Sequence, residues 1–284
     1  MNVDGKTILI TGSTDGVGRE VALMLGAAGA TVIVHGRNSE RGAQVLDALR
    51  RNGSPASVFY QADLSSFAQV HSLADTVKQN HERLDVLINN AGIGGFGPGG
   101  TVRQMSADAH ELRFAVNYLA GFLLTRLLLP LLEASAPSRI VNVASIGQQA
   151  IDFDDVMLER DYSGARAYMQ SKLAQVMFTF DLARELEGTG VTVNALHPAT
   201  FMDTTMVREA GVTPRNSVAQ GAKAIVHLAA SDDVQGLTGH YFDGMQPARA
   251  EPQTYDADAR EQLRKLSLRL TLFNQPPVAG DAIR

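Results

Sequence analysis

The stretch ILITGSTDGVGREV, residues 8–21, joins an apolar run to three closely spaced glycines and then to a segment with helical periodicity. Beyond the glycines, Val21, Met24 and Leu25 recur at helical spacing and begin an apolar face. Gly29 follows where helices commonly end. The stretch therefore predicts a strand, a glycine turn and a helix, in that order.

The same alternation of strand-like and helix-like segments continues along the chain. Short β-branched runs are separated by segments with helical period, as expected for parallel strands joined by helical crossovers. We therefore predict an α/β fold with a single Rossmann-type doubly wound domain over residues 1–284, whose seven-stranded parallel sheet is flanked by helices. The expected strands are residues 7–11, 31–35, 57–61, 85–90, 139–145, 191–196 and 239–244.

The three glycines of the turn suit the phosphates of a dinucleotide. Gly12 permits a tight turn, Gly16 lets the backbone approach a pyrophosphate, and Gly18 permits close packing of helix on sheet. The N-terminus of the helix would add unpaired N–H groups and partial positive charge. A purely structural glycine turn is the alternative, but the strand-turn-helix context favours cofactor binding.

Composition excludes several classes of protein. The net charge of -5 argues against a nucleic-acid surface, and the absence of cysteine excludes disulfides and thiolate metal sites. The seven histidines are scattered, so we expect no metal site. The N-terminus leads straight into a strand-like run without a signal peptide, and Arg126 and Pro130 interrupt the most apolar later run. We expect a cytoplasmic protein that does not bind a membrane.

Two segments do not follow the alternating pattern. Residues 147–164 are rich in acidic side chains without a clear period, and the tail at 247–284 contains one short helix-like segment. In open α/β sheets, ligands bind beyond the carboxyl ends of the strands, where such excursions lie. We expect both segments to shape the substrate site.

Further motifs follow the glycine turn in order. They are NNAG at 89–92, FAVN ending at Asn117, IVNVAS ending at Ser145, and YMQSK at 168–172. With the G-x-x-x-G-x-G turn, they make residues from about 5 to 245 resemble the short-chain dehydrogenase/reductase family. The long insertion ahead of the tyrosine is most similar to the retinol-dehydrogenase-like branch.

The resemblance implies a catalytic set of Asn117, Ser145, Tyr168 and Lys172. A carbonyl that accepts hydride needs an acid at its oxygen, and a tyrosine serves if a nearby positive charge lowers its pKa. Lys172, one helical turn from Tyr168, supplies that charge. Ser145 would hydrogen-bond the substrate oxygen. The resemblance implies that Asn117 holds a water linking Lys172 to solvent.

Ser145 and His197 are also residue types that serve other roles. Ser145 alone would be an ordinary turn or N-cap serine, and it lacks the preceding glycine of a hydrolase elbow. His197 could act as a base, but its place beside Pro198 favours an ordinary residue at a strand end. Because Tyr168 and Lys172 follow Ser145 in the sequence, the catalytic role of Ser145 is favoured.

Arg37, helped by Asn38, follows the second strand and favours NADP over NAD, because arginine pairs with the 2′-phosphate. Asp15 departs from relatives that carry a basic residue in the glycine turn. Asp63 has an alternative role as a helix N-cap. Motifs and resemblance together place the cofactor contacts at Gly12, Ser13, Thr14, Asp15, Gly16, Val17, Gly18, Arg37, Asn38, Asp63, Leu64, Asn90, Ala91, Gly92, Tyr168, Lys172, Pro198 and Thr200.

We therefore expect an NADP(H)-dependent oxidoreductase (EC 1.1.1.-) that interconverts an alcohol and a ketone or aldehyde. The substrate should be small and apolar, because Phe96, Phe153, Phe201 and Met202 fall in expected site loops. The alternatives are a non-catalytic NADP-binding regulatory protein and a sugar-nucleotide epimerase or dehydratase, which usually has a larger C-terminal domain. The resemblance also implies a possible homo-oligomer that pairs through the long helices.

Overall fold

The computed structural model describes residues 3–97 and 100–273 as one eight-stranded sheet in the order β3-β2-β1-β4-β5-β6-β7-β8. Strands β1 to β7 are parallel, and β8 is antiparallel to β7. The strands are β1 (Thr7–Ile10), β2 (Thr31–Gly36), β3 (Val58–Gln61), β4 (Val86–Asn89), β5 (Ser138–Val143), β6 (Val191–His197), β7 (His240–Asp243) and β8 (Gln246–Ala248).

The eighth strand corrects the expected seven-stranded, all-parallel sheet. β8 follows β7 through a tight turn in which Gly244 has a φ of +59°. Pro247 lies in the middle of β8, and proline is typical of edge strands because it donates no ladder hydrogen bond. Three residues with a central proline carry no strand-like pattern, so the sequence did not indicate this strand.

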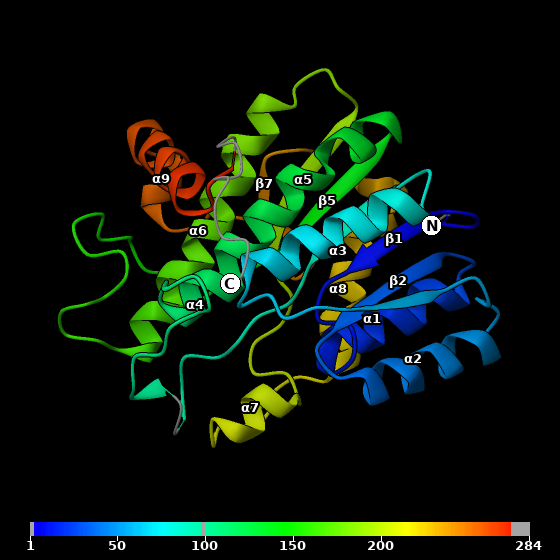
Figure 1. Cartoon of the computed structure of the whole chain (residues 1–284), viewed down its shortest axis with the longest axis horizontal. Helices are drawn as coiled ribbons and strands as arrows, with labels where there is room; N and C mark the ends of the chain where they lie inside the picture. The colour runs from blue at the N-terminus through cyan, green and yellow to red at the C-terminus, as the bar shows by residue number, and fades with distance from the viewer. Residues whose placement is uncertain (1–2, 98–99, 274–284) are drawn as a thin grey trace, which may run out of the picture.

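Helices cover both faces of the sheet (Figure 1). One apolar core lies between the sheet and α1, α2 and α8, and a second lies between the sheet and α3, α5 and α6. A π-helix at Ala115–Leu119 joins α4 to α5. The helices are α1 (Gly16–Ala27), α2 (Ser39–Arg51), α3 (Phe67–Asn80), α4 (Leu112–Phe114), α5 (Ala120–Ala134), α6 (Gly164–Glu185), α7 (Thr205–Glu209), α8 (Val218–Ala230) and α9 (Ala257–Leu270).

The order of the strands brings the sequence motifs together at one end of the sheet, where the strands have their carboxyl ends. β1 pairs with both β2 and β4, so the chain winds away from β1 in both directions and forms the switch point of a doubly wound sheet. The carboxyl ends of the parallel strands then meet there. Gly12, Asn90, Ser145 and Pro198, each just past the end of a strand, lie at that end.

The apolar run that the sequence places in a buried helix belongs to the core. Leu112–Ala134 is long and apolar enough to cross a membrane, but 67% of its most apolar window is buried inside the fold. α5 packs against α3 and the sheet, with Phe122 and Leu128 fully buried. Its apolar character is therefore explained by the core of this domain.

Residues 147–164 form an irregular segment held by polar contacts. Asp155 accepts hydrogen bonds from the backbone N–H groups of Glu159 and Arg160, at 2.8 and 3.1 Å. Gln253, in the tail, donates to the Ile151 carbonyl and accepts from the Ile151 N–H, at 3.1 and 2.7 Å. The insertion and the tail are thus joined beside the sheet edge.

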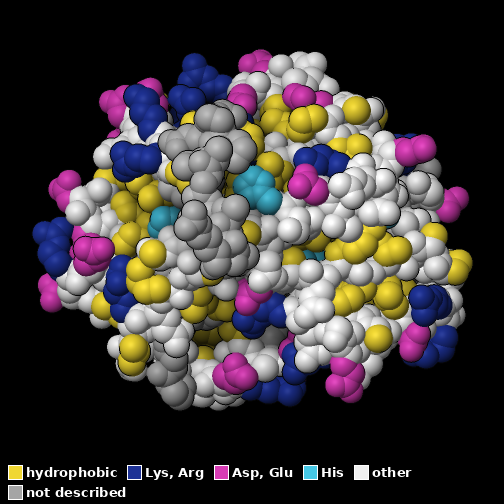
Figure 2. Space-filling view, viewed as in Figure 1, with side chains coloured by type: hydrophobic (Ala, Val, Ile, Leu, Met, Phe, Trp, Pro, Cys, Tyr) yellow, Lys and Arg dark blue, Asp and Glu magenta, His cyan; other side chains and the backbone are white. Residues whose placement is uncertain are grey.

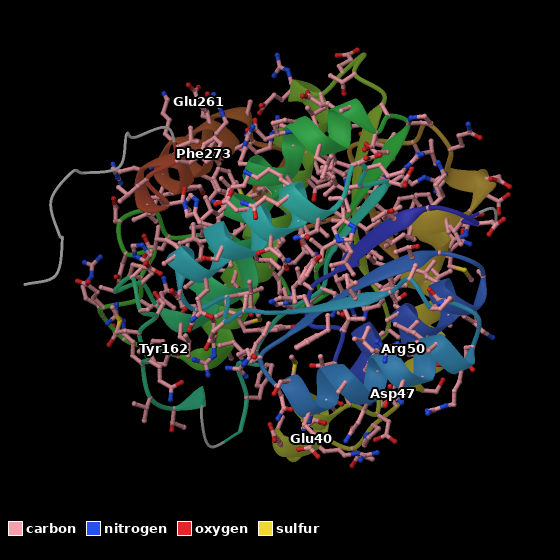
Figure 3. All side chains as sticks on the ribbon, turned by 45° about the vertical axis from the view of Figure 1, so that its right-hand side comes forward. Glu40, Asp47, Arg50, Tyr162, Glu261 and Phe273 are labelled. Atoms are coloured by element: carbon pink, nitrogen blue, oxygen red, sulfur yellow. The ribbon has the colours of Figure 1, made fainter. Side chains whose placement is uncertain are left out.

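A buried ion pair between Arg113 and Glu111 fixes the end of the insertion. Arg113 donates to the Tyr162 hydroxyl at 2.6 Å and to the Gly94 carbonyl at 2.8 Å. Tyr162, labelled in Figure 3, in turn donates to the fully buried Glu111 at 3.1 Å. Glu111 also accepts from the Phe114 N–H. This network ties the insertion and the loop after β4 to α4, the start of the helix that carries Asn117.

The tail continues past β8 into α9, which packs on α6. Leu263 of α9 is 1% exposed, and Ser267 hydrogen-bonds the buried Tyr118 hydroxyl at 2.6 Å. Arg264 pairs with Asp181 of α6 at 3.3 Å. The helix-like segment expected in the tail is therefore confirmed, whereas the sequence NQPPVAG at 274–280 lies outside the described residues.

Candidate active site

At the glycine turn, the chain after β1, the start of α1 and the chain after β4 lie close together. Gly12 has a φ of +66°, and a Cβ added there would lie 2.9 Å from the Cα of Ala91. A Cβ on Gly18 would collide with Asn90 and with the Gly12 carbonyl. Only glycine fits both positions, so the backbone at the start of α1 forms a bare cradle. That cradle suits a pyrophosphate at the N-terminus of a helix.

Asn90 and Ser13 support this turn from inside the protein. Asn90 donates to the carbonyls of Thr11 and Gly12 at 2.8 and 3.1 Å. The Ser13 side chain is fully buried and donates to the Ile10 carbonyl at 2.8 Å. Both side chains hold the turn in place, and any cofactor contact of Ser13 has to come from its backbone.

Asp15 connects the turn to two other elements. Its carboxylate caps α1 by accepting from the Gly16 N–H at 2.7 Å. It also pairs with Arg41 of α2 at 3.0 Å and accepts from the Thr205 hydroxyl of α7 at 2.9 Å. The acidic residue that seemed unfavourable for NADP is therefore paired with a cation. The sequence motifs do not indicate Arg41, which reaches Asp15 from α2.

Some of the residues expected to contact the adenine end of the cofactor hold the local backbone instead. Arg37 is exposed, whereas Asn38 caps α2 by accepting from the Arg41 N–H at 2.9 Å. Asp63 accepts from the Ser65 N–H at 2.9 Å, and α3 begins later, with Ser66 at its N-cap position. The alternative role of Asp63 as a helix N-cap is therefore wrong.

Leu64 and Thr200 complete the set of expected contacts outside the turn. Leu64 packs in the core with 5% of its surface exposed, so only its backbone can meet an adenine ring. The Thr200 hydroxyl lies 3.0 Å from Nε2 of His197. His197 ends β6 and uses its ring on this local contact, and burial lowers its pKa. It behaves as the ordinary strand-end residue that the sequence favours.

Tyr168 and Ser145 meet at the carboxyl end of β5. Burial raises the pKa of Tyr168, and the neighbouring Ser145 side chain opposes that rise. The Ser145 hydroxyl oxygen accepts from the Gly147 N–H at 3.0 Å, which leaves its O–H to donate to the tyrosine. Tyr241 donates to the Ser145 carbonyl at 3.0 Å. Ser145 is thus held from three directions.

Lys172 lies beneath Tyr168 in a buried position. Its Nζ is 5.8 Å from the centre of the Tyr168 ring and donates to the Val143 carbonyl at 2.9 Å and to Gln175 at 2.8 Å. Burial lowers the pKa of Lys172 to about 7. Gln175 belongs to none of the sequence motifs; the only signal for it is a polar side chain on the buried face of α6.

Asn117 lies in the π-helix, an irregularity that often marks functional sites. Its side chain accepts from the Ile93 N–H at 2.7 Å and donates to the Ile93 carbonyl and to Ser171 at 3.1 and 3.0 Å. A Cβ on Gly92 would lie 3.3 Å from Asn117 Oδ1 and 3.5 Å from Lys172 Nζ. Glycine at this position allows Asn117 and Lys172 both to lie close to the backbone after β4.

A cavity of about 320 Å³ opens beside Ser145. It lies between the end of β5 and the β7–β8 hairpin, so the start of the tail forms one wall. Among the described residues, no group of His, Cys, Asp and Glu could hold a metal ion. Side chains lining the cavity are Ile146, Gln148, Tyr241, Asp243, Arg249 and Glu251.

The outer surface carries charges of both signs. Figure 2 shows basic and acidic side chains interspersed over the face in view, without an extended block of one sign. Binding to nucleic acid normally uses a clustered excess of Lys and Arg. This face offers no such surface.

The fold and its glycine turn are those of a dinucleotide-binding oxidoreductase, and residues 6–214 match the short chain dehydrogenase family. The chain belongs to this family, in its retinol-dehydrogenase-like branch. Retinol dehydrogenase 13 of Homo sapiens is 36% identical over 97% of this chain and 87% of its own length. Retinol dehydrogenase 14 of Homo sapiens is 37% identical over 93% of this chain and 85% of its own.

Solved structures show the same fold. An uncharacterized protein from Mycobacterium paratuberculosis is similar with a TM-score of 0.79 and 29% identity, covering 95% of each chain. A short chain dehydrogenase from Shigella flexneri, complexed with NADP, has a TM-score of 0.70 and 28% identity over 86% of this chain and 98% of that one. The present chain is an oxidoreductase of this class that uses a nicotinamide cofactor.

Proposed function

We propose that the protein is an NADP(H)-dependent oxidoreductase that interconverts an alcohol and a ketone or aldehyde on a small apolar molecule. The observation that carries the proposal is the meeting of Ser145, Tyr168 and Lys172 at the carboxyl end of β5. A proton donor, a hydrogen-bond donor and a cation there serve the oxygen of a carbonyl group. The bare glycine cradle beside them suits the phosphates of the cofactor.

In the reduction direction the bound nicotinamide supplies hydride to carbon, while this chain's own residues manage the oxygen. Tyr168 gives its proton to that oxygen, and Ser145 steadies the developing negative charge through its O–H. Lys172 favours the resulting tyrosinate because its positive charge lies beneath the ring. In oxidation the same residues act in reverse, with tyrosinate as the base.

The preference for NADP is part of the proposal and is supported by two cations. Arg37 is exposed just beyond the end of β2, and Arg41 lies one helical turn further on with its guanidinium at Asp15. An arginine at this strand end suits a 2′-phosphate. The similar Shigella flexneri structure contains NADP, which agrees with this choice.

The apolar substrate is supported by part of the expected set of residues. Phe96 is 52% exposed with its ring centre 6.3 Å from that of Tyr168, and Phe201 is 38% exposed. Phe153 packs against the core, and Met202 packs against Gly221, so these two are structural. Because two relatives are named retinol dehydrogenases, we include retinoids in the proposed class.

The test is a substrate screen on the wild type and on Tyr168→Phe in parallel. NADPH consumption is followed with a panel of aldehydes and ketones that includes retinal, and cofactor binding is measured separately. We expect turnover by the wild type, and loss of turnover in the variant with cofactor binding within about threefold. NADPH binding without turnover on any carbonyl would overturn the proposal and favour a regulatory protein.

We also propose a cytoplasmic location, supported by a chain without cysteine, as is common in reducing compartments. Fractionation of the cells that make the protein tests this. Recovery of the protein in the membrane fraction after a salt wash would contradict it.

A further inference from the structure

A buried histidine lies directly behind the glycine turn. His35 is the next-to-last residue of β2, and only 2% of its surface is exposed. The four residues before it are apolar or β-branched, so an imidazole here needs a specific reason. Burial lowers the pKa of His35 to about 4, although the charge of Asp63 acts in the opposite direction. The ring is therefore neutral at physiological pH.

The contacts of His35 define which ring nitrogen carries the proton. The Gly12 nitrogen lies 3.1 Å from Nδ1, and a backbone N–H can only donate. Nδ1 must therefore accept, and the single proton of the neutral ring is on Nε2. Nε2 lies 3.2 Å from the Ala62 carbonyl, to which it donates. Both ring nitrogens are then satisfied, which an imidazolium could not achieve because its Nδ1–H would face the Gly12 N–H.

The same turn is held by the backbone of β2. The Ser13 N–H donates to the His35 carbonyl at 2.9 Å, and the His35 N–H donates to the Ser13 hydroxyl at 3.0 Å. From the opposite side, Asn90 donates to the Gly12 carbonyl. Gly12 thus has its N–H held by one side chain and its carbonyl by another, at a φ of +66°.

We propose that His35 is a positioning residue of the cofactor site, which holds the Gly12 N–H through Nδ1 and so sets the geometry of the turn that binds the cofactor phosphates. This inference rests on the proposed function, since the ligand is the proposed NADP. His35 does not contact the phosphates itself. It acts through Gly12, whose N–H would otherwise lack this partner at a residue whose backbone samples a wide range of conformations.

The test is a matched pair of variants, His35→Asn and His35→Gln, with NADP⁺ binding measured by calorimetry. The Asn oxygen can take the place of Nδ1 and accept from Gly12, whereas the Gln amide reaches the Nε2 side and can donate to Ala62. We expect the Asn variant to bind within about threefold of the wild type. We expect the Gln variant to bind about tenfold more weakly, the effect of losing one hydrogen bond. Equal affinities of the two variants, whether both high or both low, would overturn the proposal.

A second measurement does not depend on cofactor binding. A long-range proton–nitrogen correlation spectrum of the wild type shows which nitrogen of His35 is protonated; we expect Nε2, and an Nδ1–H tautomer would overturn the proposal. The amide signal of Gly12 should move less in the Asn variant than in the Gln variant. If the wild type binds no NADP⁺, the proposed function fails, and the spectrum still decides whether His35 holds Gly12.

Discussion

At the residue scale, the active site concentrates charge that is expensive to bury. Lys172 has 5% of its surface exposed, and its two visible acceptors are neutral, the Val143 carbonyl and Gln175. Its pKa falls to about 7 because an ammonium loses its hydration there. If catalysis needs Lys172 to be charged in this buried position, its burial should lower the free energy of unfolding, as strained active sites often do.

Replacing Lys172 by Met should therefore abolish turnover yet stabilise the protein at mildly acid pH. The folded pKa of Lys172, about 7, lies below its ordinary value of 10.5. The unfolded chain then binds more protons between these values, so the stability of the wild type rises with pH across that window and the penalty is complete below about pH 7. We expect the variant to exceed the wild type by about 1 kcal/mol or more at pH 6, and the gap to narrow towards pH 9.5. Urea denaturation at both pH values checks this, and parallel pH profiles would contradict it.

A second residue-scale prediction concerns cofactor choice. Arg37→Asp removes the proposed partner of the 2′-phosphate and places a carboxylate where it can accept from a ribose hydroxyl. The ratio of kcat/KM for NADPH to that for NADH should fall at least about tenfold, the value of a charge-assisted hydrogen bond. Arg51→Asp, at the exposed far end of α2, makes the same charge change and should leave the ratio unaltered. Similar ratios in both variants would disprove the assignment.

The sequence predicted single residues well where spacing within one element decided the geometry. Tyr168 and Lys172 lie one helical turn apart, so their meeting could be predicted from α6 alone. Arg41 and Thr205 could not, because they reach Asp15 from residues 26 and 190 positions away. Such contacts depend on how elements are placed in space, and one sequence carries no record of that placement.

At the element scale, the π-helix at Ala115–Leu119 decides what Asn117 can contact. It lies between α4 and α5 and directs the Asn117 amide at Ile93, just beyond β4, and at Ser171 on α6. One side chain thus connects three elements around the site. The sequence indicated a helix here but not its change of pitch, because the apolar pattern continues through it.

Asn117→Ala should consequently lower the free energy of unfolding by more than the loss of one hydrogen bond would. It leaves both the N–H and the carbonyl of Ile93 without a partner in a half-buried loop, which we expect to lower the free energy of unfolding by about 2 to 3 kcal/mol. Ser171→Ala removes one of the three bonds and should cost about 1 kcal/mol. Chemical denaturation of the two variants measures this difference. Equal losses would show that the Ile93 bonds contribute little.

At the scale of the whole molecule, the sequence pattern predicted the parallel strands and the helices that cover them, but not the order of the strands in the sheet. It missed β8, and it did not indicate that the helix of the tail packs on α6. α9 runs across α6, and its inner face meets Tyr118 and Asp181. The expectation of a homo-oligomer rested on pairing through the long helices. α9 now covers one of those helices, and β8 covers the free edge of β7.

We therefore predict that the protein is monomeric at micromolar concentration, and that releasing α9 makes it associate. Leu263→Arg places a charge in the buried face of α9 and should detach the helix, since an unpaired buried charge is costly. The aromatic side chains of Tyr118 and Phe178 beneath α9 would then be exposed, and apolar surface of that kind promotes association. Glu261→Arg introduces an arginine at an exposed position of the same helix (Figure 3) and should remain monomeric. Sedimentation equilibrium of the three proteins measures their masses. A wild-type dimer, or a Leu263→Arg variant that stays folded and monomeric, would show that α9 does not block self-association through α6.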